Sequence, residues 1–413
     1  MTNVYALRCK ECGRDYPLEP IYVCDFCFGP LEVNYDYDVI AKNISRESIQ
    51  DGPLTIWRYD ELLPASRDNA VNIGAGMTPL LKADNLGKEL GLNNLWIKND
   101  SANPTHSFKD RVVSVAATKA VEFDFDTIAC ASTGNLAGAT AAHGAKAGMN
   151  TMVFIPANLE KGKILGAAIF GSVVLVKGNY DDVNRLCSEL GDDRRWAFVN
   201  INMRPFYSEG SKSIGYELAE QLGWHAPKHV VVPVASGSLF TKVYKGLQEF
   251  AQLGVIDSAD TKMHIAQPFG CAPVAKAFIE GYAHPKPVVP DTIAKSLAIG
   301  SPADGMYSVG IANKTGGSGT IVPEREIAEG MKLLAETEGI FTETAGGVVI
   351  STLRRLAREG VIDPDEETVA LITGTGLKTI EAIADSVKTI TIDPTAHSFD
   401  EAVMPENTGA LRS

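Results

Sequence analysis

The feature that most limits the fold is a regular alternation of short apolar segments with helical segments. Between residues 105 and 210, helical periodicity separates strand-like segments at 127–131, 151–155, 172–176 and 196–200. Short apolar strands joined by helices are typical of a parallel sheet that is covered on both faces. The alternation resumes after residue 211, with predicted strands at 229–234, 263–267 and 368–373. We therefore predict an α/β fold with two open, mostly parallel sheets that carry helices on both faces.

The same pattern divides the chain into a small module, two α/β domains and a tail. The predicted bounds are 1–45 for the module, 46–104 and 211–395 for the large domain, 105–210 for the small domain and 396–413 for the tail. Residues 281–320 are rich in Pro and Gly and are expected to form irregular loops, and a closing helix is expected after Lys378. Ligands of such sheets bind beyond the carboxyl ends of the strands, so the strand-to-helix turns are the candidate sites.

The chain of 413 residues is acidic, with a formal net charge of −13 and a pI of about 5.1. This charge argues against general binding to nucleic acid or to anionic membranes. No apolar run reaches the roughly 18–20 residues that span a bilayer, and the N-terminus lacks the pattern of a signal peptide. Cys130, Cys187 and Cys271 lie in apolar segments, as reduced core cysteines do. We expect a cytoplasmic protein.

The first notable turn leads into a helix at Lys109, inside the sequence SFKDR at 107–111. A lysine at a helix start lies beside the positive end of the helix dipole, which disfavours its protonated form. An uncharged amine is what imine formation requires. An isolated lysine at such a place is most often a solvated surface residue, so the assignment depends on its neighbours.

Two further turns offer backbone N–H groups and hydroxyls at the start of a helix, where an anion can bind. One turn comprises Ser132, Thr133, Gly134 and Asn135, and the other comprises Ser236, Gly237, Ser238 and Leu239. A simple helix cap is the alternative for each. The second turn lacks the Gly-Lys-Ser/Thr ending of a Walker loop and the G-x-G-x-x-G pattern of dinucleotide sites.

Two cysteine pairs near the N-terminus have the spacing of a zinc site. Cys9 and Cys12 form one C-x-x-C pair, Cys24 and Cys27 form another, and eleven residues separate them. Four thiolates at this spacing can surround Zn²⁺ tetrahedrally, and the metal would supply much of the folding energy of so short a module. Four reduced cysteines without metal are the alternative. Residues 1–40 carry three basic and seven acidic side chains, which favours a structural or interfacial role over nucleic-acid binding.

Taken in order, these segments resemble the fold-type II enzymes that use pyridoxal 5′-phosphate (PLP), whose fold is like that of the tryptophan synthase β subunit. The motifs that carry the resemblance are GMTPL at 76–80, SFKDR at 107–111, ASTGN at 131–135, NMRPF at 202–206, EGSK at 209–212, FTETAGG at 341–347 and TGTGLK at 373–378. SFKDR and the four-cysteine module are similar to those of the threonine synthases in particular. The likeness covers almost the whole chain.

The resemblance implies a role for each turn. Lys109 would hold PLP as a Schiff base, Asn135 would bond its 3′-oxygen, and Thr373 would bond its pyridine nitrogen. The cup for the cofactor phosphate would consist of Ser236, Gly237, Ser238 and Leu239. The substrate and its carboxylate would be bound by Ser107, Ser132, Thr133 and Gly134. A neutral threonine at the pyridine nitrogen makes a weaker electron sink than an aspartate would.

Asn202 and Arg204, with Lys163 upstream, are a candidate second anion site. The planar guanidinium of arginine matches phosphate oxygens, although a structural ion pair is the alternative. The resemblance implies that this site holds the leaving phosphate of O-phospho-L-homoserine, which threonine synthases convert with water to L-threonine and phosphate. It also implies a homodimer.

Two other interpretations stay open at this point. A relative on the same scaffold could be a threonine or serine dehydratase, or a β-replacement enzyme that uses phosphoserine, such as cysteate synthase. A zinc-ribbon binding protein with an inactive PLP domain is a second possibility, against which the intact Lys109, Asn135 and Thr373 count.

Overall fold

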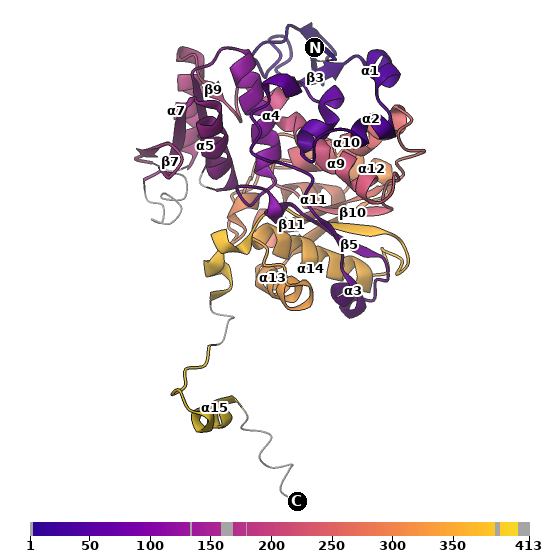
Figure 1. Ribbon diagram of the computed structural model, residues 1–413, viewed down its shortest axis with the longest axis vertical. Coiled ribbons are helices and arrows are strands. Elements are labelled where there is room, and N and C mark those ends of the chain that lie inside the picture. Colours follow the sequence, from indigo (N-terminus) through magenta and orange to yellow (C-terminus); the bar gives the residue numbers. More distant parts are fainter. Residues whose placement is uncertain (1–2, 133, 158–167, 179, 385–388, 404–413) are drawn as a thin grey trace, which may run out of the picture.

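The computed structural model describes residues 3–132, 134–157, 168–178, 180–384 and 389–403 (Figure 1). The strands are β1 (Val4–Cys9), β2 (Asp15–Tyr16), β3 (Leu31–Tyr35), β4 (Leu80–Lys82), β5 (Leu95–Asn99), β6 (Thr127–Ala131), β7 (Asn150–Pro156), β8 (Ser172–Val176), β9 (Ala197–Phe198), β10 (His229–Pro233), β11 (Lys262–Pro268), β12 (Ser318–Val322) and β13 (Thr368–Ile372). The helices are α1 (Tyr37–Asn43), α2 (Arg46–Gln50), α3 (Asp84–Leu90), α4 (Lys109–Glu122), α5 (Asn135–Ala147), α7 (Tyr180–Asp193), α8 (Arg204–Glu209), α9 (Lys212–Gln221), α10 (Ser238–Gln252), α11 (Pro273–Ile279), α12 (Gly305–Thr315), α13 (Glu324–Glu338), α14 (Thr344–Arg358) and α15 (Ala396–Val403).

The larger sheet has six strands in the order β12-β11-β10-β13-β5-β4. All neighbours run parallel except β4 and β5. Helices α3, α13 and α14 lie on one side of it, and α9, α10 and α12 lie on the other (Figure 1). Successive side chains of β10 point to opposite faces of the sheet. Val231 packs with α13 and α14, whereas Val230 and Val232 pack with α9 and α10. This two-sided burial is why the strand is apolar throughout.

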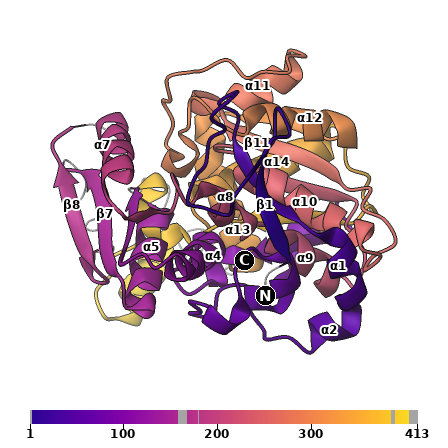
Figure 2. The same ribbon diagram turned by 90° about the horizontal axis from the view of Figure 1, so that it is seen from above.

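The smaller sheet has four parallel strands in the order β8-β7-β6-β9. It lies beside the larger sheet, with α4 and α5 next to it (Figure 2). The strand β6 is buried along its whole length, and Ile128 and Cys130 face one core while Ala129 and Ala131 face another. The predicted α/β fold with two open, mostly parallel sheets and helices on both faces is therefore confirmed.

Residues 4–35 contain a third, antiparallel sheet in the order β2-β1-β3. It packs onto the main body of the protein, since Leu7 and Val33 belong to the same buried cluster as Val112 and Phe206. The four-cysteine module is thus joined to the rest by a shared core. None of the described helices is long and apolar enough to cross a bilayer.

Two expectations about secondary structure are wrong. Residues 281–320 contain α12 and β12 in addition to loops, because α12 buries small or polar residues such as Ser308 and Ala312 and so shows little apolar periodicity. Directly after Lys378, the described residues form a 3-10 turn, Ile380–Ala382, in place of the expected closing helix, and residues 385–388 lie outside the described residues. The preceding 3-10 turn, Gly376–Lys378, is bonded to another part of the chain, because Gly376 N–H donates to the carbonyl of Phe341. The expected tail contains α15.

Candidate active site

Lys109 is the first residue of α4, and its side chain points to a phenol. Lys109 Nζ donates a hydrogen bond of 2.9 Å to Tyr207 Oη, and it lies 4.5 Å from the centre of the Phe108 ring. Tyr207 belongs to α8 and is 9% exposed. The amine therefore lies between the lysine helix and a second helix that starts with Arg204.

The residues around Lys109 fix the start of α4 from two sides. Asp110 accepts hydrogen bonds from the backbone N–H and the hydroxyl of Thr105, at 2.6 and 2.7 Å, which closes the preceding turn. Burial raises the pKa of Asp110 to about 6. Arg111 is fully buried between Asp100 and Glu217, with Nε 2.7 Å from Asp100 Oδ2. Burial alone would raise the pKa of Glu217, but Arg111 and Lys98 outweigh it and hold that pKa at about 2.

The turn after β13 meets the lysine segment. Phe108 N–H bonds the carbonyl of Thr373 at 2.9 Å, and Ser107 pairs with Gly374 in an isolated bridge. The hydroxyl of Ser107 is fully buried and has no hydrogen-bond partner among the described residues. A buried hydroxyl without a partner is a group that a bound molecule can satisfy.

Glu343 joins two of the predicted cofactor residues. Thr373 Oγ1 donates to Glu343 Oε1 and Asn135 Nδ2 donates to Glu343 Oε2, both at 2.8 Å. Lys378 Nζ donates to Asn135 Oδ1 at 2.9 Å and to the carbonyl of Thr105 at 2.6 Å. Burial lowers the pKa of Lys378. Thr373, Glu343, Asn135 and Lys378 thus form one hydrogen-bonded chain beside Lys109.

The turn from β10 to α10 is tightly packed. Gly237 has a φ of +96°, and a Cβ atom there would lie 2.6 Å from the carbonyl oxygen of Asp304. Asp304 N–H also bonds the carbonyl of Ser236 at 2.8 Å. Ser238 begins α10, and the N-cap residue Gly237 provides no side-chain cap. Ser238 N–H makes a long contact of 3.5 Å with Ser236 Oγ, so the N–H groups that follow it are the ones available to an anion.

The turn from β6 to α5 is open. Gly134 is exposed, and a Cβ atom there would meet no atom of the described residues within 4 Å. Ser132 Oγ accepts from Gly134 N–H at 3.3 Å, and α5 also starts without a side-chain cap. Thr133 lies outside the described residues.

The predicted second anion site is brought together only in part. Arg204 begins α8 and forms an ion pair of 2.9 Å with Asp304, which also contacts the turn at Gly237. Both ends of the Asn202 amide bond the backbone, at Phe198 N–H and Trp196 carbonyl, each at 2.9 Å. Lys163 lies outside the described residues.

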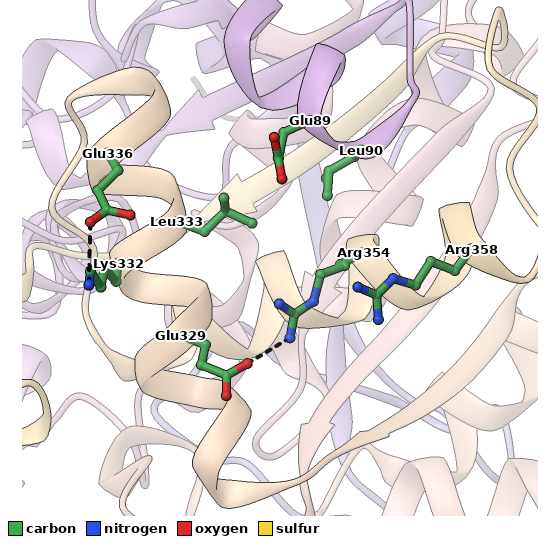
Figure 3. A pocket seen from close by; sticks show the side chains of 8 residues that line it. All are labelled: Glu89, Leu90, Glu329, Lys332, Leu333, Glu336, Arg354 and Arg358. Atoms are coloured by element: carbon green, nitrogen blue, oxygen red, sulfur yellow. Dashed lines mark hydrogen bonds and ion pairs between the residues drawn. The ribbon is translucent and has the colours of Figure 1, made fainter. Parts of the chain in front are cut away.

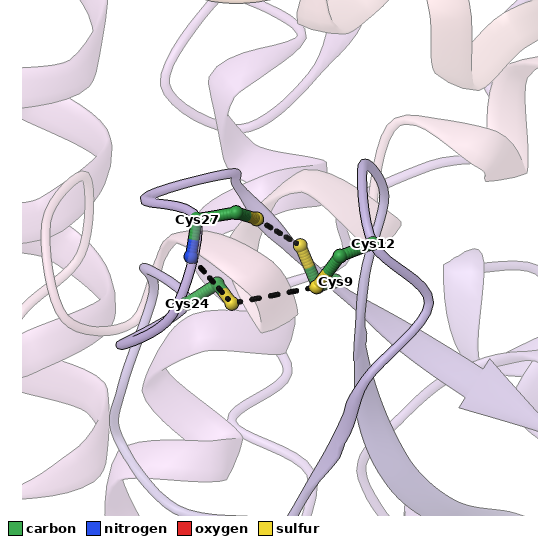
Figure 4. A group of neighbouring side chains, drawn as sticks. All are labelled: Cys9, Cys12, Cys24 and Cys27. Carbon is green, nitrogen blue, oxygen red and sulfur yellow. Dashed lines mark hydrogen bonds between the residues drawn. The ribbon is translucent and has the colours of Figure 1, made fainter.

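The four cysteines of the N-terminal module converge on one point (Figure 4). Their sulfur atoms all lie within 4.8 Å of one another, with Cys9 and Cys27 at 3.4 Å and Cys12 and Cys24 at 3.7 Å. Both close pairs join one C-x-x-C turn to the other. Tyr16 Oη lies 2.9 Å from Cys24 Sγ. The cluster can therefore offer four sulfur ligands to a single metal ion.

A surface hollow of about 340 Å³ between α3, α13 and α14 contains none of the predicted site residues (Figure 3). Its lining is charged, with Arg354 paired to Glu329 and Lys332 paired to Glu336. The residues that line it are Glu89, Leu90, Glu329, Lys332, Leu333, Glu336, Arg354 and Arg358.

Sequence reasoning assigned no role to Tyr207, Glu343 or Lys378. Glu343 and Lys378 lie inside the motifs FTETAGG and TGTGLK, which gave the only signal that could have drawn attention to them. Tyr207 follows NMRPF directly and gave no signal of its own. All three act through partners that lie far away in sequence.

Comparison with known proteins identifies the family. Residues 71–374 match the family described as pyridoxal-phosphate dependent enzyme, and residues 8–32 match the family described as NinF protein. The chain is 38% identical to threonine synthase of Methanocaldococcus jannaschii over 91% of its own length and 93% of that protein. It is 38% identical to threonine synthase of Methanosarcina acetivorans over 97% and 99% of the two chains.

Among solved structures, threonine deaminase isoform 2 of Solanum lycopersicum has a TM-score of 0.62 at 22% identity, covering 85% of this chain and 90% of that chain. Serine racemase of maize has a TM-score of 0.61 at 18% identity, covering 75% and 91%. At these identities the likeness concerns the fold alone. Since the family match spans most of the chain and the curated relatives align over nearly its whole length, the chain belongs to the pyridoxal-phosphate dependent enzymes and, among them, to the threonine synthases.

Proposed function

We propose that the protein converts O-phospho-L-homoserine and water to L-threonine and phosphate, with PLP bound covalently to Lys109. The observation that carries this proposal is the meeting of Lys109, Asn135 and Thr373 at one place, although they come from three distant segments. The similarity to curated threonine synthases over nearly the whole chain supports the choice of substrate.

The residues at the site fit PLP. The amine of Lys109 could bind the aldehyde of the cofactor. The Ser107 hydroxyl, which is buried and has no partner among the described residues, could bind one of its polar groups. The packed helix start at Ser238 could bind its phosphate. The proposed cofactor residues are Lys109, Asn135, Ser236, Gly237, Ser238, Leu239 and Thr373. When bound, PLP supplies the electron sink that lets bonds at the amino-acid carbons break.

The protein groups would bind the substrate and move its protons. The first N–H groups of α5, with Ser107, Ser132, Thr133 and Gly134, would hold the substrate and its carboxylate. The amine of Lys109 would act as acid and base for the α and β protons. Arg204 would orient the phosphate through its planar guanidinium. Asn202 and Lys163 stay predicted phosphate contacts.

We also propose that Cys9, Cys12, Cys24 and Cys27 hold a structural Zn²⁺. A tetrahedral site with Zn–S bonds of about 2.3 Å has sulfur–sulfur edges of about 3.8 Å. The two close pairs, at 3.4 and 3.7 Å, agree with such edges. Removal of the metal by a chelator should lower the melting temperature, and the metal content of the purified protein should be close to one ion per chain.

Three further predictions accompany this function. The division into a module, two domains and a tail at residues 45, 104, 210 and 395 is supported by the way the strands group into sheets. A cytoplasmic location and a homodimeric state follow from the resemblance and the composition.

The substrate is tested by measuring phosphate release from O-phosphohomoserine and from O-phosphoserine, with ammonia release from threonine alongside. We expect rapid turnover of O-phosphohomoserine only. Turnover of O-phosphoserine or threonine alone would replace the substrate and leave the cofactor proposal standing.

The cofactor is tested by absorbance and borohydride reduction. The wild-type protein should carry a cofactor band that borohydride shifts permanently, and Lys109→Ala should lack that shift. A protein that never acquires the band with added PLP would rule out the proposed function.

A further inference from the structure

Tyr207 is the hydrogen-bond partner of the reactive lysine. Its phenol oxygen lies 2.9 Å from Lys109 Nζ, and this is the sole hydrogen bond that the amine makes within the described part of the chain. The ring is 9% exposed, and its centre lies 5.6 Å from the amine. The contact has ordinary hydrogen-bond geometry, and it joins a buried phenol to an amine of intermediate exposure.

The neighbouring carboxylates are engaged elsewhere. Asp110 is bonded to Thr105, and Glu343 is bonded to Thr373 and Asn135. No carboxylate of the described residues forms an ion pair with Lys109. A carboxylate partner would stabilise the charged ammonium, whereas a neutral phenol does so far less. The phenol of Tyr207 is therefore the group that holds the amine of Lys109 in place.

The phenol is held in place from both ends of α8. Arg204, at the start of the helix, is paired with Asp304 at 2.9 Å. Glu209, at its end, is fully buried and bonded to Lys212 at 2.7 Å, to Lys242 at 2.5 Å and to Tyr35 at 2.8 Å. Tyr207 lies between these anchors, so its hydroxyl has little freedom to leave the amine.

We propose that Tyr207 is a further catalytic residue, which holds the free amine of Lys109 and directs its lone pair toward the substrate. The phenol oxygen accepts one N–H of the amine, so the lone pair points away from the ring. When the amine takes a proton from a substrate carbon, the new N–H bond forms with that lone pair, and the electron pair of the broken C–H bond stays with the substrate. The catalytic part of this inference rests on the proposed function.

The test compares Tyr207→Phe with the wild type in two assays. In the first, PLP is added to cofactor-free protein and the growth of the covalent cofactor band is followed by absorbance, which needs no substrate. We expect the band to form at least about tenfold more slowly, the factor that one ordinary hydrogen bond carries, while the equilibrium affinity for PLP changes less than about threefold. In the second assay, kcat should fall at least about tenfold with little change in KM.

Tyr59→Phe is the matched control, because Tyr59 is also a buried tyrosine but makes no hydrogen bond to Lys109. Its hydroxyl instead donates a hydrogen bond of 2.6 Å to the carboxylate of Glu220. It should change neither the rate of band formation nor kcat. Tyr207→His returns a hydrogen-bond acceptor and should restore part of both rates. The proposal fails if Tyr207→Phe stays within twofold of the wild type in both assays. If no substrate is turned over but the band forms slowly, the proposed function fails and the contact with Lys109 stands.

Discussion

The two strand-to-helix turns β10–α10 and β6–α5 both lead into a helix from a glycine, but their packing is opposite. The β10–α10 turn, residues 236–238, has a glycine at positive φ pressed against Asp304. The β6–α5 turn, residues 132–135, has an exposed glycine with free space around it. Both lead into helices that start without a side-chain cap. Sequence alone shows two similar anion sites, and packing separates them.

The difference suits the two ligands that the family handles. A cofactor that stays bound needs a preformed cup, because each degree of freedom removed in advance strengthens binding. A substrate that enters and leaves needs space next to its contacts. Under the proposed function, the β10–α10 turn would serve the first task and the β6–α5 turn the second.

We expect Gly237→Ala to have the largest effect of the substitutions at the two turns. The added methyl group meets the Asp304 carbonyl at 2.6 Å and the backbone has a φ of +96°, so the turn must move. Strain of this kind costs on the order of 1–3 kcal/mol, and we expect PLP affinity to fall on the order of 100-fold. Equilibrium dialysis with PLP measures this affinity. Unchanged affinity would show that the turn does not hold the cofactor phosphate.

Asp304→Asn separates the packing of the β10–α10 turn from the charge beside it. The backbone bond from Asp304 to Ser236 remains, but Arg204 loses its ion pair. We expect KM for the phosphorylated substrate to rise about tenfold through loss of orientation, with PLP affinity unchanged. Steady-state kinetics and dialysis check this. A fall in PLP affinity alone would contradict the division of roles.

Acidification should change the local stability of the strands β10 and β11 and of the helix α5 by different amounts. Burial lowers the pKa of His264, in β11 beside β10, to about 3, and that of His143, in α5, to about 4. Below a pH of about 6.5 the unfolded chain protonates these histidines while the folded protein does not, so stability is lost as the pH falls. Near His143 this loss of stability is opposed by Asp110. Because the pKa of Asp110 in the folded protein is raised to about 6, its protonation stabilises the folded state as the pH falls.

We therefore expect the amides of β10 and β11 to lose more protection from hydrogen exchange than those of α5 between pH 7 and pH 5.5. The difference should be about 1 kcal/mol. Hydrogen exchange followed by mass spectrometry, corrected for the intrinsic pH dependence of exchange, measures this directly. Equal loss on both sides would mean that Asp110 does not offset His143.

Gly134→Ala is expected to give the smallest effect. The added methyl group enters free space, so PLP affinity and melting temperature should stay unchanged and KM should rise about threefold. The same change in sequence thus gives very different results at the two turns. A loss of PLP affinity as large as that of Gly237→Ala would remove the distinction between them.

Much of this could be predicted from the sequence. Strand β6 matches the predicted range residue for residue, because an apolar run buried on both faces is easy to recognise. Strand β8 also matches its predicted range, although it is a partly exposed edge strand. Lys109 and the cysteine pairs were found from their local motifs. The partners were not found, since Tyr207 and Glu343 reach the site only through contacts between segments about 100 to 200 residues apart. Helix α12 was missed because its buried face consists of small and polar residues.

The place of β13 in the larger sheet has a consequence for synthesis of the protein. Strand β13 lies between β10 and β5, so β5 has only β4 beside it in the larger sheet until residues 368–372 have been translated. Lys109 is made early, but Phe108 cannot bond the carbonyl of Thr373 until the end. A ribosome-bound chain would therefore display the lysine without a pocket, and any truncation before residue 368 should give a protein without a cofactor site. Activity is thus acquired in a single late step.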